Sequence, residues 1–170
     1  MGVRKVRPLY EGEEDRRHEE EARKEISLLW DMDIYKCPRR YPVDFQMIDK
    51  SGMCLGFGEF KRRGNYSSAW LADNGYKISL LKWIEMKNMA TYTGLEVVLF
   101  VRSGDGDLWW ISVDSTCDIE IDRFSSSKRS DDQDIEPAVN ISFGDFKIVE
   151  ESLAIQYELS GEDTPEGSIN

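Results

Sequence analysis

Residues 41–63 read YPVDFQMIDKSGMCLGFGEFKRR, and this stretch decides the fold. Its first part alternates apolar and polar side chains, which predicts a strand over residues 42–49. Residues 50–52, Lys-Ser-Gly, predict a turn, and residues 53–63 predict a second strand. The two strands together form a predicted β-hairpin.

Two acidic residues and a lysine on this hairpin are the candidate site. Glu59 and Lys61 share one face of the second strand because side chains alternate along a strand, and the hairpin register lets Asp44 approach that face. Two carboxylates, helped by the backbone carbonyl of Phe60, form an all-oxygen site that suits Mg²⁺ or Mn²⁺ rather than zinc. A lysine beside them orients or deprotonates water and stabilises charge on a phosphate. These groups suffice for phosphodiester hydrolysis.

The tripeptide Glu-x-Lys is common in charged proteins, and pairing of charges across strands also explains it. The order of the surrounding elements is more specific. A charged helix is predicted over residues 13–30, with Ala22, Ile26 and Leu29 on one apolar stripe. A second helix, over residues 77–94, follows the hairpin after a polar stretch.

The remaining segments indicate one α/β domain. Residues 95–102, LEVVLFVR, are a nearly continuous apolar run, as expected of a central strand that is covered on both faces. Further strands are predicted over residues 107–114 and 138–149. The expected organisation has three parts: an N-terminal arm (1–12), one domain (13–149) and an acidic, partly disordered tail (150–170).

The net charge of −11 is unevenly distributed. Residues 1–33 carry −3 and residues 103–170 carry −13, whereas residues 34–102, which include the hairpin, carry +5. Surfaces that bind phosphate are usually positive, so the middle third is still able to bind nucleic acid. We hypothesise that the acidic tail reduces non-specific retention on DNA by competing for this basic region.

Other residue types exclude several kinds of site. His18 is the only histidine, which excludes HEXXH and multi-histidine metal centres and argues against Ser-His-Asp chemistry. The three cysteines, Cys37, Cys54 and Cys117, fit neither a disulfide framework nor a zinc cluster. No stretch approaches the ~20 apolar residues of a membrane span, and no signal peptide is recognisable. We therefore expect a cytoplasmic protein without a membrane partner.

From about residue 18 to residue 149 the sequence resembles the PD-(D/E)XK, or restriction-endonuclease-like, nucleases. The resemblance is to small phage-type members, related to archaeal Holliday-junction resolvases and to viral-type replication-repair nuclease domains. The matching segments are YPVDF (41–45), GFGEFKRR (56–63), YKISLLKW (76–83), TGLEVVLFVR (93–102) and DIEPAVNISFGDF (134–146).

This resemblance implies an αβββαβ core with a mixed central sheet flanked by helices. It implies that Asp44 and Glu59 bind metal and that Lys61 assists the attacking water. One departure from the motif is Val43, which separates the proline from the aspartate. Members often add a glutamate from the first helix, and Glu19 fits best because it lies on the apolar stripe. Its neighbours Glu20 and Glu21, or a merely solvated face, remain alternatives.

Basic and aromatic side chains near the motif are candidate DNA contacts. Four basic residues could bind phosphate, as in the resembled family, or be charges on a solvated face: Arg62, Arg63, Lys77 and Lys82. Four tryptophans suggest base stacking: Trp70, Trp83, Trp109 and Trp110. Core packing is the expectation for these, because three of them lie in regular elements.

The leading hypothesis is a Mg²⁺- or Mn²⁺-dependent nuclease that cuts DNA, structure-specific in type, in the DNA metabolism of a phage or mobile element. The first alternative is a non-catalytic binding module with the same fold, whose acidic last third acts as a DNA mimic or docking surface. The second is a structural or assembly protein, against which the intact Asp44, Glu59 and Lys61 argue. Junction cutting would need a homodimer, with residues 93–102 or the last strand as candidate interface.

Overall fold

The computed structural model describes residues 12–114, 119–125 and 135–150. The expected acidic tail and N-terminal arm fall almost wholly outside these residues, as does Cys117. The elements are, in order, α1 (Glu13–Leu29), β1 (Asp33–Lys36), β2 (Phe45–Ile48), β3 (Cys54–Arg63), α2 (Ser68–Asn74), β4 (Tyr76–Ser79), α3 (Leu80–Thr93), β5 (Glu96–Ser103), β6 (Leu108–Ser112), β7 (Ile119–Ser125), β8 (Ile135–Ile141), a 3₁₀ turn (Phe143–Asp145) and β9 (Lys147–Ile148).

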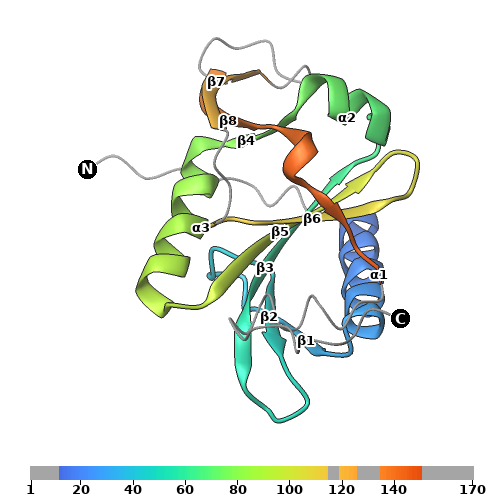
Figure 1. The fold of residues 1–170 in the computed structure, drawn as a ribbon, viewed down its shortest axis with the longest axis vertical. Coiled ribbons are helices and arrows are strands. Elements are labelled where there is room, and N and C mark those ends of the chain that lie inside the picture. Colours follow the sequence, from blue (N-terminus) through green and yellow to red (C-terminus); the bar gives the residue numbers. More distant parts are fainter. Residues whose placement is uncertain (1–11, 115–118, 126–134, 151–170) are drawn as a thin grey trace, which may run out of the picture.

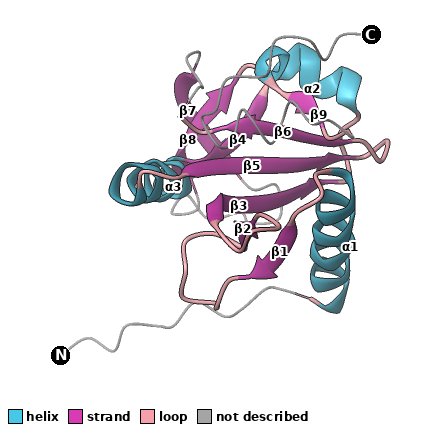
Figure 2. Ribbon diagram, turned by 60° about the horizontal axis from the view of Figure 1, so that its bottom comes forward, coloured by secondary structure: helices cyan, strands magenta, loops and turns pink. Residues whose placement is uncertain are grey.

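The central sheet has six strands in the order β1-β2-β3-β5-β6-β9. β3 and β5 are parallel and the other pairs are antiparallel, which confirms the expected mixed sheet and the β2–β3 hairpin. α1 and α3 lie on opposite sides of this sheet (Figures 1 and 2). The elements α1, β1, β2, β3, α3 and β5 reproduce the αβββαβ order, so the restriction-endonuclease-like fold class is confirmed.

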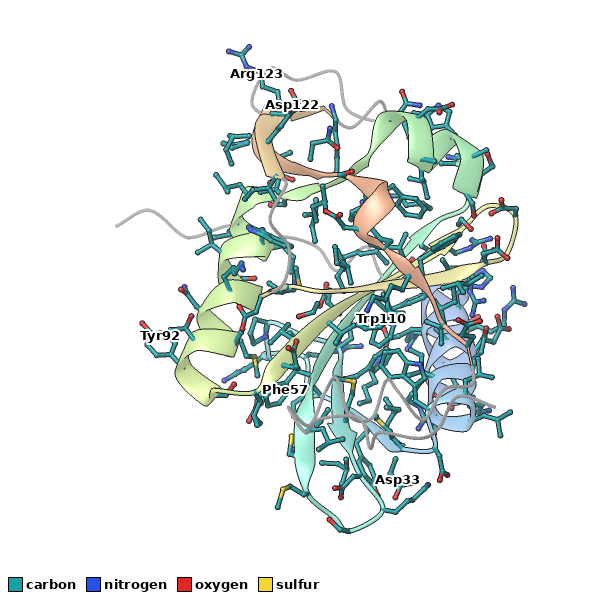
Figure 3. All side chains as sticks on the ribbon, in the orientation of Figure 1. Asp33, Phe57, Tyr92, Trp110, Asp122 and Arg123 are labelled. Carbon is teal, nitrogen blue, oxygen red and sulfur yellow. The ribbon has the colours of Figure 1, made fainter. Side chains whose placement is uncertain are left out.

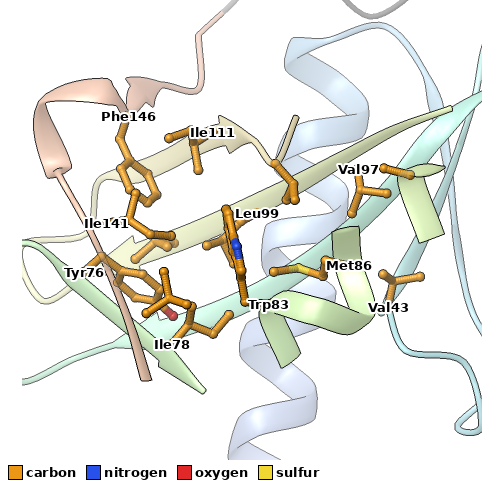
Figure 4. Close-up of a cluster of buried hydrophobic side chains, with 14 of the residues drawn as sticks. Val43, Tyr76, Ile78, Trp83, Met86, Val97, Leu99, Ile111, Ile141 and Phe146 are labelled. Atoms are coloured by element: carbon orange, nitrogen blue, oxygen red, sulfur yellow. The ribbon is translucent and has the colours of Figure 1, made fainter. Parts of the chain in front are cut away.

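β5 is the central strand because both of its faces are apolar. From Val97 to Val101 no side chain is exposed, and successive side chains enter two separate hydrophobic clusters. Val97, Leu99 and Val101 pack on the α3 side (Figure 4), and the residues between them pack on the α1 side. We call these clusters the α3-side core and the α1-side core. Each fully buried aliphatic or aromatic side chain contributes roughly 1.5–3 kcal/mol, so the sheet is held from both faces.

A second, three-stranded antiparallel sheet, β4-β8-β7, lies at one end of the domain (Figure 1). Tyr76 and Ile78 of β4 add their side chains to the α3-side core (Figure 4). This small sheet is built from segments on either side of β5 and β6 in the sequence. It therefore depends on the core for its position.

Three predicted elements had clearly wrong boundaries. The strand expected over residues 42–49 begins at Phe45, so Asp44 precedes it rather than lying on it. The helix expected over residues 77–94 begins at Leu80, because residues 76–79 pair with β8 as strand β4. The strand expected over residues 138–149 is divided between β8 and β9, which belong to different sheets. The 3₁₀ turn between them redirects the chain.

Four elements had no usable signal in the sequence. β1 has four residues, of which Ile34 alone is buried, so it shows no alternation. The short helix α2 lies in a stretch that was predicted to be polar and irregular, and most of β4 lies in the predicted second helix. β7 has exposed apolar side chains such as Ile121. Tertiary pairing stabilises these segments more than their local patterns do. Within the described residues, no helix is long and apolar enough to cross a bilayer.

Candidate active site

β2 and β3 separate at Asp44. Their ladder runs to the pair Phe45–Gly58, and beyond it the Asp44 side chain takes the place of a strand partner. The Asp44 N–H donates to the Gly58 carbonyl (N to O, 2.9 Å), and Asp44 Oδ2 accepts from the Phe60 N–H (2.8 Å). Pro42, which has no N–H to donate, precedes the separation. The edge of β3 is thereby left open next to an aspartate.

The backbone of Phe60 faces this open edge. In a strand, the N–H and C=O of one residue point toward the same neighbouring strand. Because the Phe60 N–H meets Asp44, its carbonyl also points to the side that β2 has left. Val43 packs in the α3-side core and Phe45 in the α1-side core, so the chain turns over at Asp44. Because the chain reverses its faces at Asp44, no residue of β2 pairs with Phe60, whose carbonyl is the expected ligand.

Glu59 is enclosed on the α3 side of β3. Its side chain is 1% exposed, and its Oε2 is buried without a hydrogen-bond partner among the described residues. Burial raises the pKa of Glu59, and the charge of Asp44 raises it further, while Lys61 and Lys82 act in the opposite direction. An enclosed carboxylate with an unused oxygen costs folding free energy unless a cation or a hydrogen bond satisfies it.

Two lysines contact the same oxygen of Glu59. Lys61 Nζ forms an ion pair with Glu59 Oε1, and Lys82 Nζ, from α3, lies 3.3 Å from it. Lys82 Nζ also donates to the Pro42 carbonyl (2.9 Å). Burial lowers the pKa of Lys61, but the charges of Glu59 and Asp44 more than offset this, so the pKa is raised overall. Lys61 is therefore an ammonium at neutral pH.

A pocket of about 260 Å³ lies on the α1 side of this cluster. Its lining residues are Asp15, His18, Glu19, Asp44, Phe60, Lys61 and Arg62. Glu19 is 7% exposed, whereas Glu20 is half-buried and Glu21 is exposed. The pocket brings Glu19 together with Asp44 and Lys61, while Glu59 lies behind β3 rather than in its wall.

Lys36, on β1, is a site residue that the sequence reading missed. Its Nζ lies 2.5 Å from Glu19 Oε1, so it neutralises the one glutamate of this run that faces the pocket. No local signal could have found it, because β1 was not recognisable. His18 also lines the pocket, and its side chain is 17% exposed and lies near Glu14 and Glu21.

The four basic candidates have different surroundings. Arg62 lines the pocket, its side chain is 42% exposed, and its nearest carboxylate, Glu14, is 3.8 Å away. Arg63 instead donates to the Lys77 carbonyl (3.1 Å) and stacks over the Tyr76 ring. Lys77 forms an ion pair with Asp122 on β7, at the end of the molecule opposite the β2–β3 turn (Figure 3). Arg63 thus joins β3 to the small sheet, whereas the Lys77 side chain connects two strands within that sheet.

The donor set fits a hard divalent cation. Asp44 and Glu59 offer carboxylate oxygens, the Phe60 carbonyl points to the same edge, and the unused Oε2 of Glu59 is an acceptor that a cation would satisfy. Among the described residues, no three His, Cys, Asp or Glu side chains are grouped closely enough to hold a metal ion.

Comparison with known proteins gives the family. Among solved structures, Hjc, a Holliday junction resolvase from the archaeal hyperthermophile Archaeoglobus fulgidus, is 11% identical with a TM-score of 0.48, over 88% of this chain and 97% of that chain. No curated protein matches the sequence. Residues 5–149 match the family described as "Phage putative PDDEXK endonuclease". Because the match spans most of the chain, this protein belongs to that phage PDDEXK family.

Proposed function

We propose that the protein is a metal-dependent nuclease that hydrolyses DNA phosphodiester bonds. The observation that carries this proposal is Glu59, a buried carboxylate with an unpartnered oxygen, set beside Asp44 and Lys61 where β2 leaves β3. Carboxylates whose pKa is shifted by burial and by specific charged neighbours occur often at functional sites. Membership of an endonuclease family supports the same function.

Asp44, Glu59 and the Phe60 carbonyl are the proposed ligands of Mg²⁺ or Mn²⁺. Such a cation, when bound, stabilises charge on the phosphate and makes bound water more acidic. Lys61 orients the attacking water and offsets the negative charge that develops on the phosphate. Glu19 faces the pocket from α1 and helps to position that water, with Lys36 holding its carboxylate.

Arg62 is the proposed first phosphate contact, since it lines the pocket and is half-exposed. Arg63, Lys77 and Lys82 would reach a phosphate only by giving up protein partners. We therefore assign Lys82 a positioning role. Lys82 contacts both the Pro42 carbonyl and Glu59, and so fixes the segment that carries Asp44 relative to β3.

The proposed setting is the DNA metabolism of a phage or mobile element in the host cytoplasm, on a substrate of particular structure. Cutting a four-way junction would require two active sites and hence a homodimer. β5 lies between β3 and β6 with its apolar residues buried, so it is not available as an interface. β9, at the edge of the sheet, remains a candidate.

The test is cleavage of linear, nicked, single-stranded and four-way-junction DNA in Mg²⁺, Mn²⁺ or EDTA. Wild type is compared with Asp44→Ala and Lys61→Ala. The control is Lys87→Ala, which removes a lysine of α3 that forms an ion pair with Asp114. We expect metal-dependent cutting by wild type and the control, and loss of cutting with the other two. DNA binding without cutting by wild type would favour the non-catalytic binding module.

A further inference from the structure

One tryptophan is not used in the core. All five tryptophans lie in the described residues, and four are buried or half-buried: Trp30, Trp83, Trp109 and Trp110. Trp70, on α2, is 42% exposed and stacks on Tyr66, which is 39% exposed. The ring centroids are 4.0 Å apart and the planes are inclined by 20°. The expectation of core packing is wrong for Trp70.

The backbone beneath these two rings is held on several sides. The Tyr66 N–H donates to the Arg63 carbonyl (2.9 Å), and the Tyr66 carbonyl accepts from the Gly104 N–H (2.7 Å). A Cβ on Gly104 would come within 2.6 Å of the Gly64 carbonyl oxygen, so the two turns pack backbone against backbone. The turn that presents Tyr66 is therefore fixed by the neighbouring loop.

Trp70 is fixed by the start of α2. Ser67 caps this helix by accepting from the Trp70 N–H (3.2 Å), and the Ser68 N–H donates to Asp105 (2.9 Å). A preorganised aromatic surface loses little conformational entropy when a ligand binds. The two rings stack on each other but keep 42% (Trp70) and 39% (Tyr66) of their surface exposed, and this exposed aromatic surface is available to a ligand.

The aromatic pair follows directly from the active-site pocket. Arg62 lines that pocket, and its guanidinium carbon lies 3.3 Å from where a Cβ on Gly64 would be. Gly64 begins the turn that presents Tyr66, and α2 follows at the end of β3 (Figure 1). Pocket, guanidinium and stacked rings thus succeed one another along the chain. This order suits a phosphate next to the cut and a base beyond it.

We infer that Tyr66 and Trp70 form a stacking platform for an unpaired base of the DNA substrate. The inference rests on the proposed function and adds a substrate class, namely DNA with a single-stranded segment beside the cut. Bases inside a duplex are stacked on one another, so only an unpaired or flipped base offers its face to an aromatic side chain. Asp105, which accepts from the Ser68 N–H at the start of α2, disfavours a phosphate on its side, whereas Arg62 offers a cation on the pocket side.

The test measures binding of a labelled oligothymidine and of a blunt duplex in EDTA, where no cutting occurs. The variants are Trp70→Ala, Tyr66→Ala and Trp70→Phe, with Tyr92→Ala, an 86% exposed tyrosine on α3, as the control. We expect Trp70→Ala to weaken oligothymidine binding by about 5- to 150-fold, with a smaller loss for Trp70→Phe. The affinity of each variant for the duplex should stay within about twofold of the wild-type value, as should the affinity of Tyr92→Ala for the oligothymidine.

Wild-type fluorescence should also be quenched by the oligothymidine, and this quenching should be weaker in Trp70→Phe. Unchanged oligothymidine binding by Trp70→Ala and Tyr66→Ala, or equal losses on duplex and single strand, would overturn the platform. Rings that instead serve a protein partner would give that unchanged result. If wild type cuts duplex DNA while these variants bind normally, the platform fails and the nuclease stands. If the variants lose oligothymidine binding but wild type cuts no DNA, the platform stands and the proposed nuclease function fails.

Discussion

The two faces of β3 hold charge in different ways. On the α3 face, Glu59 is enclosed, and one of its oxygens meets both Lys61 and Lys82. On the α1 face, Glu19 lines the pocket and pairs with Lys36, whose side chain is 49% exposed. Glu59 is enclosed and meets two ammonium groups, so its ion pairs are costly to break, whereas solvent screens the pair of Glu19 with the half-exposed Lys36 more strongly. We infer that the α3 face fixes the reacting geometry, while the α1 face admits substrate and solvent.

The largest expected effect comes from exchanging the two glutamates for their amides. Glu59→Gln should lower the cleavage rate by about 10²–10³-fold, because it removes the charge of a proposed cation ligand. Glu19→Gln should lower it about tenfold, as expected of a group that acts through the water. Single-turnover cleavage in Mg²⁺ measures both. Equal losses would contradict the proposed division between the two faces.

Exchanging the lysines sharpens the comparison further. Lys82→Gln should weaken Mn²⁺ binding about tenfold by titration calorimetry, because the link between the Pro42 carbonyl and Glu59 is lost. The DNA affinity of Lys82→Gln in EDTA should be unchanged. The control Lys87→Gln should keep both the wild-type Mn²⁺ affinity and the wild-type DNA affinity. A loss of DNA affinity with normal Mn²⁺ binding would instead make Lys82 a phosphate contact.

The adjacent arginines should separate binding from stability. Arg62→Gln should reduce DNA affinity and lower the slope of log affinity against log salt by about 0.9, with stability unchanged. Arg63→Gln should lower the free energy of unfolding by about 1 kcal/mol, since it removes a hydrogen bond to the Lys77 carbonyl and the contact with Tyr76. Salt-dependent DNA binding and urea unfolding of both variants provide the check. A loss of stability in Arg62→Gln and a loss of DNA affinity in Arg63→Gln would make Arg63 the DNA contact and Arg62 the structural residue.

The smallest effect concerns the thiol of Cys37, which lies in the α3-side core. Burial raises the pKa of this thiol to about 11, with smaller contributions from Asp44 and Cys54. Because the thiolate is the reactive form, alkylation of Cys37 at pH 8 should be slow and should accelerate as the pH approaches 11. Mass-spectrometric mapping after iodoacetamide treatment measures this. Rapid labelling at pH 8 would show that this face is open to solvent.

Much of the fold follows from periodicity in the sequence. α1, the β2–β3 hairpin and β5 have long or regular apolar patterns, and the structure confirms all three. The small sheet shows no such pattern, since its strands are short or expose apolar residues, and it forms where distant segments pair. The choice of Glu19 over Glu20 rested on a single apolar stripe; Glu19 is the more buried of the two and lines the pocket, and its catalytic role stays a prediction.

The sequence by itself determined which groups share a strand face, because a period of two residues places Glu59 beside Lys61 without any tertiary information. That Asp44 approaches them was predicted from the hairpin, but the ladder shifts register between Met47 and Ile48, so the turn alone does not set this pairing. Tertiary structure alone decided how each charge is used. Lys82 meets Glu59, Lys36 meets Glu19, and Arg62 and Arg63 diverge because packing brings distant segments together. Burial and ion pairing are properties of that packing, and no local pattern encodes them.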